Sequence, residues 1–371
     1  MSGVLRVCHV VPKLPPVREG IGLYAMQLAE EWRKGEGIES AFVVADPQWR
    51  PDPAAGTPEG TVRLEERTPG ALRRAVAQTK ADRVLLHYVG YGYDREGLPF
   101  WLVRAAEGLG EAGLPLAVAY HEMWATGPFW KKVFYTFPLQ REIARRLLRH
   151  AAAAYTTVGY YDRLLRGLQR PGEEKVSGPI SGFGLRPGER KAPDTGALRL
   201  LFYGLPSTRL LALRAQRRLL ARWNGAGGVG TVVLAGRAAE DGAEVGELAR
   251  CGIGPERIER RFDLSEEAIR EVLAGADLYL TGYSSCLIGK STTVLSALAA
   301  GCPVLAADGR EAAPLRVGVH FFVPDEFRGS ALPSRDRLAE VGEAGRQWWR
   351  TEGAPERIAA RIAGLVRGAG R

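Results

Sequence analysis

A glycine, a lysine and three hydroxyl-bearing residues stand in a row in the last third of the chain, and together they could bind an anion. They are Gly289, Lys290, Ser291, Thr292 and Thr293. A turn that opens a helix points unpaired backbone N–H groups, and the positive end of the helix dipole, at one place. The lysine adds a mobile positive charge and the hydroxyls add hydrogen-bond donors. This combination predicts a binding site for a phosphorylated ligand.

Two buried strands are expected to hold this segment in place. An apolar run ends near Tyr283, and a helix is predicted from Val294 to Ala300. Gly301 has the position of a helix C-cap glycine, and Pro303 cannot continue the helix. The run from Val304 to Ala307 predicts the next strand. A turn that leads into a helix between two parallel strands is a favourable place for a phosphate.

The P-loop is a rival interpretation of the same residues. That motif requires Gly-x-x-x-x-Gly-Lys-Ser/Thr. Gly289 and the two residues after it supply its last three positions, but Ser284 replaces its first glycine and Gly282 lies too far upstream. The segment also comes late in the chain, whereas a P-loop usually follows an early strand. A P-loop-like nucleotide hydrolase is therefore kept only as the weaker hypothesis.

A second set of candidate residues follows two strands predicted in the first half, Arg83 to His87 and Leu116 to Tyr120. His87 ends the first strand, and His121 and Glu122 follow the second. Ligands of parallel α/β sheets bind beyond the carboxyl ends of the strands, and histidine exchanges protons near neutral pH. Aromatic residues nearby could stack on a sugar or pack against lipid. The aromatic candidates are Tyr88, Tyr91, Tyr93 and Trp124. The alternative for this whole set is ordinary packing and hydrogen bonding.

The length and the order of predicted elements favour two α/β domains. The chain has 371 residues, enough for two cores of ordinary size. Strands and helices alternate through both halves, which predicts two doubly wound parallel sheets. A polar stretch rich in proline and glycine lies between the halves. The predicted divisions are a first domain over 1–184, a linker over 185–197, a second domain over 198–345 and a C-terminal helical segment over 346–371 that packs back across the domains.

The net charge of +9 comes largely from arginine. Arginines cluster within 141–149 and again within 209–222. Most such clusters are solvated helix faces, but they also favour an anionic membrane surface as a partner. Nucleic acid is not expected, because no nucleic-acid-binding module accompanies the charge.

The cysteines and the N-terminus bear on location. The four cysteines have neither paired nor metal-ligand spacing, which predicts a reduced, cytoplasmic protein without a metal site. The N-terminal apolar stretch is interrupted by Arg6 and His9 and is interpreted as a first strand, not a signal peptide. The protein is expected in the cytoplasm, with peripheral attachment to the inner face of the membrane as the further hypothesis.

Two nucleotide-binding-like halves, a linker and the late unit ending in Gly301, Pro303 and Val304 together resemble the GT-B glycosyltransferases. Within them, the chain is most similar to the retaining family 4-like branch, or glycosyl transferases group 1. The resemblance covers nearly the whole chain, although its motifs are degenerate. It implies two Rossmann-like domains that face a cleft. It also implies an enzyme of the hexosyltransferase type that needs neither a metal nor a cofactor. This enzyme would move a sugar from a nucleotide-diphospho-sugar to a hydroxyl of a glycan or glycolipid. The expected setting is the synthesis of cell-surface polysaccharide, glycolipid or a related glycoconjugate.

The resemblance also assigns roles to the residues. His121 would lie near the sugar, and Glu122 is the alternative base toward the acceptor. The family usually has two glycines before its first helix, where Gly20 and Gly22 would let the donor diphosphate approach, and Glu19 is expected as an exposed loop carboxylate. The residues expected on the donor phosphates are Arg209 and the anion-binding segment, which consists of Gly289, Lys290, Ser291, Thr292 and Thr293. The residues expected on the acceptor side are His87, Tyr88, Tyr91, Tyr93 and Trp124.

The sequence departs from the family at its two glutamates, which lie eight positions apart and hold the sugar and the ribose. Ile288 and Ser296 occupy those positions here. A serine hydroxyl could still reach a ribose, whereas an isoleucine cannot hold a sugar. The same fold without transfer is therefore a second hypothesis, either as a sugar-nucleotide epimerase or as a catalytically silent nucleotide-sugar-binding protein.

Overall fold

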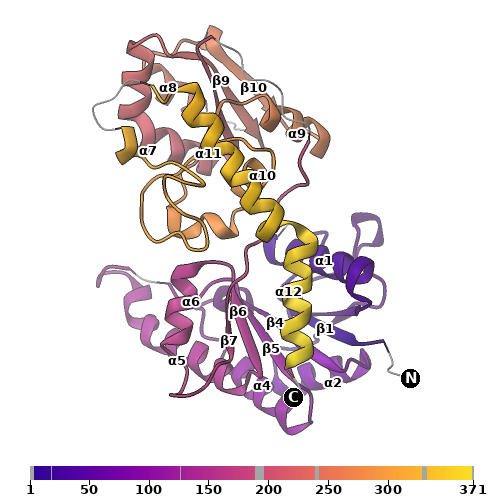
Figure 1. Cartoon of the computed structure of the whole chain (residues 1–371). Coiled ribbons are helices and arrows are strands. Elements are labelled where there is room, and N and C mark those ends of the chain that lie inside the picture. The colour runs from indigo at the N-terminus through magenta and orange to yellow at the C-terminus, as the bar shows by residue number, and fades with distance from the viewer. Residues whose placement is uncertain are drawn as a thin grey trace. The chain divides into compact units, whose positions relative to one another are not determined.

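The computed structural model describes residues 4–17, 19–125, 127–188, 196–238, 242–327 and 332–369. The chain forms two compact units, which are labelled by element in Figure 1. Unit 1 comprises Met1–Ile180 and Pro355–Arg371, and unit 2 comprises Ser181–Ala354. The division thus falls a few residues before the linker predicted over 185–197, of which 189–195 lie outside the described residues.

Unit 1 is built on a sheet that has seven strands within the described residues, in the order β3-β2-β1-β4-β5-β6-β7. All neighbouring strands are parallel, so their carboxyl ends meet at one edge. The strands are β1 (Arg6–Val11), β2 (Glu39–Val44), β3 (Val62–Arg63), β4 (Arg83–Tyr88), β5 (Leu116–Tyr120), β6 (Ala153–Thr156) and β7 (Val176–Pro179). The prediction of a doubly wound parallel sheet is confirmed for this half.

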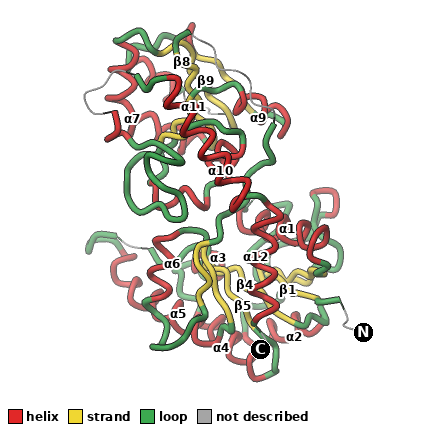
Figure 2. The backbone as a smooth tube through the Cα atoms, viewed as in Figure 1, coloured by secondary structure: helices red, strands yellow, loops and turns green. Residues whose placement is uncertain are grey.

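Helices cover both faces of this sheet (Figure 2). One core packs β1, β4 and β5 against α2 (Pro69–Gln78), α4 (Phe100–Glu111) and α5 (Lys132–His150). A smaller core on the other side packs β1 and β2 against α1 (Gly20–Glu31). The last helix, α12 (Pro355–Gly368), returns to unit 1, where the indole of Trp32 donates to the carbonyl of Ala359 at 2.9 Å.

Helix α5 contains Pro138 in its interior. Pro138 cannot donate a backbone hydrogen bond, so the sequence favours a helix that starts after it. In the structure the helix runs through Pro138 from Lys132. The short elements α3 (Gly90–Tyr93), α6 (Gly159–Arg166), β3 and β7 were not predicted.

Unit 2 has a five-stranded parallel sheet within the described residues, in the order β10-β9-β8-β11-β12. Its strands are β8 (Leu198–Gly204), β9 (Val229–Gly236), β10 (Ile258–Phe262), β11 (Leu278–Leu280) and β12 (Val304–Leu305). The helices around it are α7 (Pro206–Gly225), α8 (Ala243–Ala249), α9 (Glu266–Ala274), α10 (Thr292–Ala299) and α11 (Arg335–Trp348). The second half is therefore also a parallel α/β unit, as predicted.

The predicted strand, helix and strand around the anion-binding segment are present as β11, α10 and β12. Ser291 caps α10, because its hydroxyl accepts the backbone N–H of Val294. Gly301 has a φ of +68°, the left-handed conformation expected of a residue just past a helix end. The C-terminal segment holds two helices, since a π-helical turn (Trp349–Gly353) separates α11 from α12.

Candidate functional site

The carboxyl edge of the unit 1 sheet gathers the candidate residues of the first half. His121 and Glu122 follow β5, and the backbone N–H of His121 donates to the carbonyl of Tyr88 at the end of β4. His87 belongs to β4 itself. Because the strands are parallel and in register, the ends of β4 and β5 lie together at this edge.

Three histidines on neighbouring strands are joined there by hydrogen bonds. Nδ1 of His9 lies 3.0 Å from Nε2 of His87, and Nδ1 of His87 lies 3.0 Å from Nε2 of His121. At the other end, Nε2 of His9 lies 3.2 Å from the hydroxyl oxygen of Ser40. In both pairs the rings are stacked, with centroids 5.3 Å apart and planes 15° apart. We call Ser40, His9, His87 and His121 the histidine chain.

The histidine chain lies in the interior of unit 1. His9 and His87 have no exposed surface, and His121 exposes 9% of its own. Burial lowers the pKa of His9 to about 3. Burial, followed by the neighbouring His121 and His9, lowers the pKa of His87 well below its usual value. His9 and His87 are therefore neutral at physiological pH.

Aromatic rings enclose the chain on the side of α1. The Trp32 and Phe42 rings lie 5.2 and 5.1 Å from the His9 ring, between centroids. The edge of Tyr24 meets His121 at 4.9 Å, and the Tyr24 hydroxyl lies 3.2 Å from that of Tyr155. These apolar walls explain why the imidazoles find hydrogen-bond partners in one another.

The structure corrects most of the expected acceptor-side set. His87, Tyr88 and Tyr93 lie fully in the interior and do not line an open surface. The Tyr93 hydroxyl donates to the carbonyls of Val10 and His87. Their positions near strand ends suggested exposure, but neighbouring strands and helices cover them.

The two remaining acceptor-side candidates are accessible. Tyr91 is 47% exposed, and its hydroxyl accepts a hydrogen bond from Gln140 Nε2 at 3.1 Å. Trp124 is half-buried, with its ring edge-on to Phe137 at 5.9 Å. Of the five acceptor-side candidates, these two present surface to a ligand.

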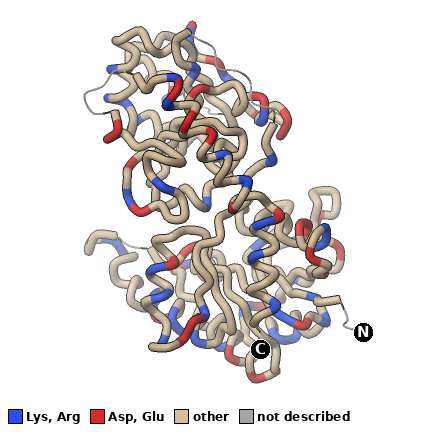
Figure 3. The backbone as a smooth tube through the Cα atoms, in the orientation of Figure 1, with Lys and Arg blue, Asp and Glu red and all other residues tan. Residues whose placement is uncertain are grey.

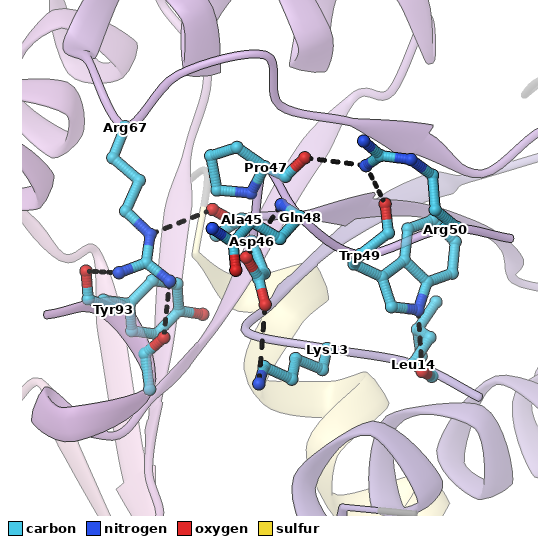
Figure 4. Close-up of polar contacts among 11 residues, drawn as sticks. Lys13, Leu14, Ala45, Asp46, Pro47, Gln48, Trp49, Arg50, Arg67 and Tyr93 are labelled. Carbon is cyan, nitrogen blue, oxygen red and sulfur yellow. Dashed lines mark hydrogen bonds and ion pairs between the residues drawn. The ribbon is translucent and has the colours of Figure 1, made fainter. Parts of the chain in front are cut away.

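The loops after β1 and β2 are tied together at the same edge (Figure 4). Lys13 Nζ lies 3.4 Å from an oxygen of Asp46, and the Trp49 indole donates to the carbonyl of Leu14 at 2.8 Å. The Arg67 guanidinium donates to the backbone carbonyls of Ala45, after β2, and of Gly92 and Tyr93 in α3. These contacts fix the loops and leave a charged rim beside the histidine chain.

Glu19 belongs to this rim and not to an exposed loop, so that expectation is wrong. The residue is half-buried, and its Oε2 atom is buried without a hydrogen-bond partner. Burial raises the pKa of Glu19; Lys13 opposes the rise, whereas Asp46 and Glu122 add to it. Glu122 is exposed and Glu19 is half-buried, so both carboxylates lie near the surface at the carboxyl edge of the sheet.

The two glycines in the first turn of α1 have different roles. A Cβ at Gly20 would meet nothing within 4 Å, so this exposed position leaves room for a ligand. A Cβ at Gly22 would lie 2.3 Å from the carbonyl oxygen of Lys13. Gly22 thus lets α1 pack on its own preceding loop, and the space expected for a diphosphate is filled there.

The anion-binding segment of unit 2 lies at the carboxyl edge of its own sheet. A 3-10 helix (Ser285–Lys290) follows β11 and leads into the Ser291 cap of α10. The Thr293 hydroxyl lies 3.0 Å from the hydroxyls of both Tyr279 and Ser291. Thr292 is exposed and Lys290 half-exposed, whereas Gly289 is buried and its carbonyl accepts the N–H of Gly182.

The positions of the missing glutamates are closed to a ligand. Ile288 is fully buried in the core of unit 2. Ser296 is 1% exposed, and its hydroxyl donates to the carbonyl of Thr292 while it accepts the N–H of Leu185. Ser296 therefore ties two segments of unit 2 together, and the expected ribose contact does not fit this arrangement.

Arg209 is also part of the interior. Its guanidinium makes two hydrogen bonds to the Glu244 carboxylate, at 2.7 and 3.1 Å, and donates to the carbonyls of Gly204 and Ala235. The side chain has no exposed surface. Arg209 thus secures the ends of β8 and β9, and in this conformation it offers no cation to a diphosphate.

Two polar groups at these edges carry little signal in the sequence. His9 is marked there only by its interruption of an apolar stretch. In unit 2, Oδ1 of Asp308 accepts from the hydroxyls of Ser284 and Ser285 at 3.0 and 3.1 Å. Burial opposes ionisation of Asp308, but these hydrogen bonds and two backbone N–H groups hold its pKa below the usual value. Serines next to a predicted strand end are the only sequence signal for this cluster.

Among the described residues, no group of three or more histidine, cysteine, aspartate and glutamate side chains is arranged to hold a metal ion.

Sequence comparison and structure comparison give different results. No protein-family model matches the chain, and no curated protein sequence matches it significantly. Solved structures match it over nearly its whole length. WaaB, a lipopolysaccharide outer core galactosyltransferase in its apo form, is 12% identical, with a TM-score of 0.63 over 98% of this chain and 100% of that one.

Two further structures give the same result. TarM is 8% identical, with a TM-score of 0.61 over 98% of this chain and 99% of that one. WaaG, a glycosyltransferase involved in lipopolysaccharide biosynthesis, is 14% identical, with a TM-score of 0.57 over 98% of this chain and 100% of that one. At these sequence identities the similarity shows the fold alone. The chain has the GT-B fold that is known from glycosyltransferases.

Proposed function

We propose that this protein is a glycosyltransferase that moves a sugar from a nucleotide-diphospho-sugar to an acceptor hydroxyl. The observation that carries the proposal is the GT-B fold, matched over nearly the full length of both chains. A histidine at the carboxyl edge of the unit 1 sheet and a capped helix start at the carboxyl edge of the unit 2 sheet support it. These are the edges where parallel α/β sheets bind ligands.

Unit 2 is proposed to hold the donor. Negative charge builds on the diphosphate as its bond to the sugar breaks. Backbone N–H groups at the start of α10, the Thr292 hydroxyl and Lys290 would stabilise that charge. Arg209, Ser296 and Gly22 are left out of this proposal because their groups are used within the protein.

Unit 1 is proposed to hold the acceptor and the proton-transfer group. His121 would accept the proton of the attacking hydroxyl, and general-base catalysis of this kind contributes about 10²–10⁴-fold in rate. The exposed Glu122 is the second candidate base. Tyr91, Trp124 and the open position at Gly20 are available to line the acceptor site. Retention of the anomeric configuration and independence of metal are carried over from the family resemblance as proposals.

A thermal-shift screen with UDP-, GDP-, dTDP- and ADP-sugars tests the donor claim. A true donor stabilises the folded state by RT ln(1 + [L]/Kd), so the melting temperature rises with the logarithm of the donor concentration once this exceeds Kd. Incubation of the stabilising donor with an acceptor panel, followed by NMR of the anomeric protons, then separates the hypotheses. A glycoside product supports transfer, and an epimerised nucleotide-sugar supports the epimerase. Binding without turnover supports the silent protein, and magnesium-dependent release of phosphate from ATP or GTP supports the hydrolase. If no nucleotide-sugar stabilises the protein, the proposal of a donor site in unit 2 is wrong.

We further propose that unit 1 docks on the inner, anionic face of a membrane through the start of α5. Large apolar side chains there are unusually exposed for a soluble surface. They are Phe129 at 64%, Trp130 at 70%, Phe134 at 49%, Tyr135 at 67% and Leu139 at 46%. The exposed Lys131 and Lys132 lie among them, and Arg146 and Arg149 continue the stripe along the helix. Aromatic rings beside cations suit an anionic headgroup layer.

A cavity near the cationic end of α5 supports this proposal. It measures about 680 Å³ and lies between α4 and α5. Arg104, Arg145, Arg146, Arg149 and Arg170 line it, opposed by Glu107 and Glu142. No helix among the described residues is long and apolar enough to cross a bilayer, so attachment here would be peripheral.

Vesicle co-sedimentation tests the docking. Phosphatidylcholine vesicles that contain phosphatidylglycerol should bind the protein, and phosphatidylcholine alone should bind it weakly. Trp130→Ser should weaken binding, whereas Tyr91→Ser, at an exposed aromatic outside the stripe, should not. Equal binding to both vesicle types, or equal effects of both substitutions, would refute the docking surface.

A further inference from the structure

The histidine chain follows from strand register. Ser40 is on β2, His9 on β1, His87 on β4, and His121 directly follows β5; these four strands are consecutive neighbours in the sheet. Val7 pairs with Ser40, and His9 lies two residues further along β1. His9 pairs with Leu85, and His87 lies two residues beyond it. Residues two apart in a strand point to the same face. Each residue of the histidine chain therefore lies two positions nearer the carboxyl edge than the one before it, and all four point to one face of the sheet.

The same offset repeats at the last step. His87 pairs with Ala119, and His121 lies two residues beyond Ala119. The result is a diagonal line of hydrogen-bonding groups. It runs from a half-buried serine on β2 to the histidine at the edge proposed for chemistry.

The diagonal has a single hydrogen-bonding direction. A neutral imidazole donates with one nitrogen and accepts with the other. If His9 donates to His87, then His87 must donate to His121, and His9 accepts from the Ser40 hydroxyl. If His121 donates from Nε2, the whole order is reversed and His9 donates to Ser40. The tautomer of His121 is therefore coupled to that of His9, on the second strand away.

Packing alone does not account for this arrangement. The neighbours of His9 on the same strand, Val7 and Val11, are apolar and fully buried. An apolar residue would satisfy this interior without desolvating a polar ring, whereas burial of a polar group is costly unless it is fully hydrogen-bonded. Three consecutive imidazoles satisfy one another's hydrogen bonds, and they also allow protons to move from ring to ring.

We infer that Ser40, His9, His87 and His121 form a proton-conducting chain in which His9 and His87 are positioning residues for His121. When Nδ1 of His121 takes a proton, its Nε2 proton passes to Nδ1 of His87. The Nε2 proton of His87 passes to Nδ1 of His9, and the Nε2 proton of His9 passes to the Ser40 oxygen. The original Ser40 proton leaves to water. One proton enters, one leaves, and each ring stays neutral with its tautomer reversed.

The identity of the proton source rests on the proposed function, because there it is an acceptor hydroxyl. The coupling itself does not depend on that function. Any base role of His121 gains from the chain, since the ring need not remain a buried cation after it accepts a proton.

Ring-nitrogen NMR of the full chain with ¹⁵N-labelled histidine tests the coupling without a ligand. Long-range ¹H–¹⁵N spectra distinguish protonated from unprotonated ring nitrogens for the five histidines. In the wild type, His9 and His87 should be neutral and protonated on the same kind of nitrogen. Ser40→Ala should shift the ring-nitrogen signals of His121, and Ser40→Thr, which keeps the hydroxyl, should restore the wild-type pattern. His320 of unit 2 serves as the internal reference.

Two results would overturn the inference. One is protonation of His9 and His87 on unlike nitrogens; the other is a Ser40→Ala spectrum in which His9 changes and His121 does not. Ser40 is half-buried, so its truncation to alanine should leave the fold intact.

A second variant links the chain to turnover. His87→Gln keeps a donor and an acceptor but cannot pass a proton, so it should keep donor binding and reduce kcat. An unchanged kcat would show that the coupling has no catalytic use. If no nucleotide-sugar binds at all, the proposed function fails while the NMR result still stands by itself.

Discussion

The carboxyl edges of the two sheets use polar residues in opposite ways. In unit 1 the polar groups are titratable and form a line of imidazoles that ends at His121. In unit 2 the polar groups are hydroxyls and a buried ion pair that hold the backbone in place, as at Ser296 and Arg209. The same parallel architecture thus gathers titratable groups at one edge and holds the backbone fixed at the other, and we propose proton transfer at the first edge and phosphate binding at the second.

The two edges need different kinds of residue for their proposed roles. A group that moves protons needs partners that can reverse their hydrogen bonds, and imidazoles and hydroxyls can. A group that cradles a phosphate needs a rigid backbone, and the capped start of α10 supplies one. Substitutions should therefore affect chemistry in unit 1, and stability or affinity in unit 2.

The largest effect on stability is expected at Arg209. Its truncation in Arg209→Ala would leave the buried Glu244 carboxylate uncompensated, which costs about 3–5 kcal/mol. The double variant Arg209→Met with Glu244→Leu should recover part of that loss, because it removes both charges. Urea denaturation measures both. A loss below about 1 kcal/mol for Arg209→Ala, the range of an exposed ion pair, would contradict the buried pairing of Arg209 with Glu244.

A smaller effect is expected from acid on the histidine chain. In the folded state the pKa of His9 is about 3, against about 6.5 unfolded, so the unfolded state binds the extra proton. Stability is then complete above the unfolded pKa and falls as the pH drops below it. Between pH 6.5 and 5.5 each such histidine should cost about 1 kcal/mol.

The variant His9→Gln removes one titrating group from unit 1. Its unfolding free energy should therefore fall less steeply with acid than that of the wild type, as measured by urea denaturation over that pH range. Equal slopes for the two proteins would mean that His9 is charged, or exposed, in the folded state.

The smallest effects on stability are expected at the start of α10. Ser291→Ala removes the helix cap and should cost about 1 kcal/mol, whereas Ser291→Gly should cost a few tenths. Thr292→Val, at the exposed neighbour, should leave stability unchanged and weaken donor binding about 3–10-fold, as expected for one hydrogen bond. Calorimetry on the three variants separates the two roles. A donor affinity that is insensitive to Thr292 would remove this hydroxyl from the proposed site.

Much of the architecture could be predicted because it depends on local patterns. The strand Leu116–Tyr120 is a short apolar run between turns, and it has the predicted bounds. Strand β10 was missed because its sequence is charged and only partly buried. Its place at the sheet edge, which no local pattern reveals, explains this composition.

The site was less predictable because it depends on pairing between distant segments. His9 and His87 are 78 residues apart, and their contact follows from a two-residue offset between paired strands. Arg209 was placed on a diphosphate because nothing in the sequence marks Glu244 as its partner. In contrast, the helix start after Gly289 was predicted correctly, since cap residues act within a few positions of one another.

Donor Kd and turnover of His121→Ala and Lys290→Ala, with His150→Ala as the control outside the histidine chain, test whether chemistry and binding are divided between the two edges. We expect His121→Ala to keep the donor Kd within about 3-fold and to reduce turnover by about 100-fold or more. Lys290→Ala should raise the donor Kd by about 10-fold, or about 1.4 kcal/mol. Unchanged turnover in His121→Ala together with an unchanged Kd in Lys290→Ala would contradict the division of chemistry and binding between the two edges.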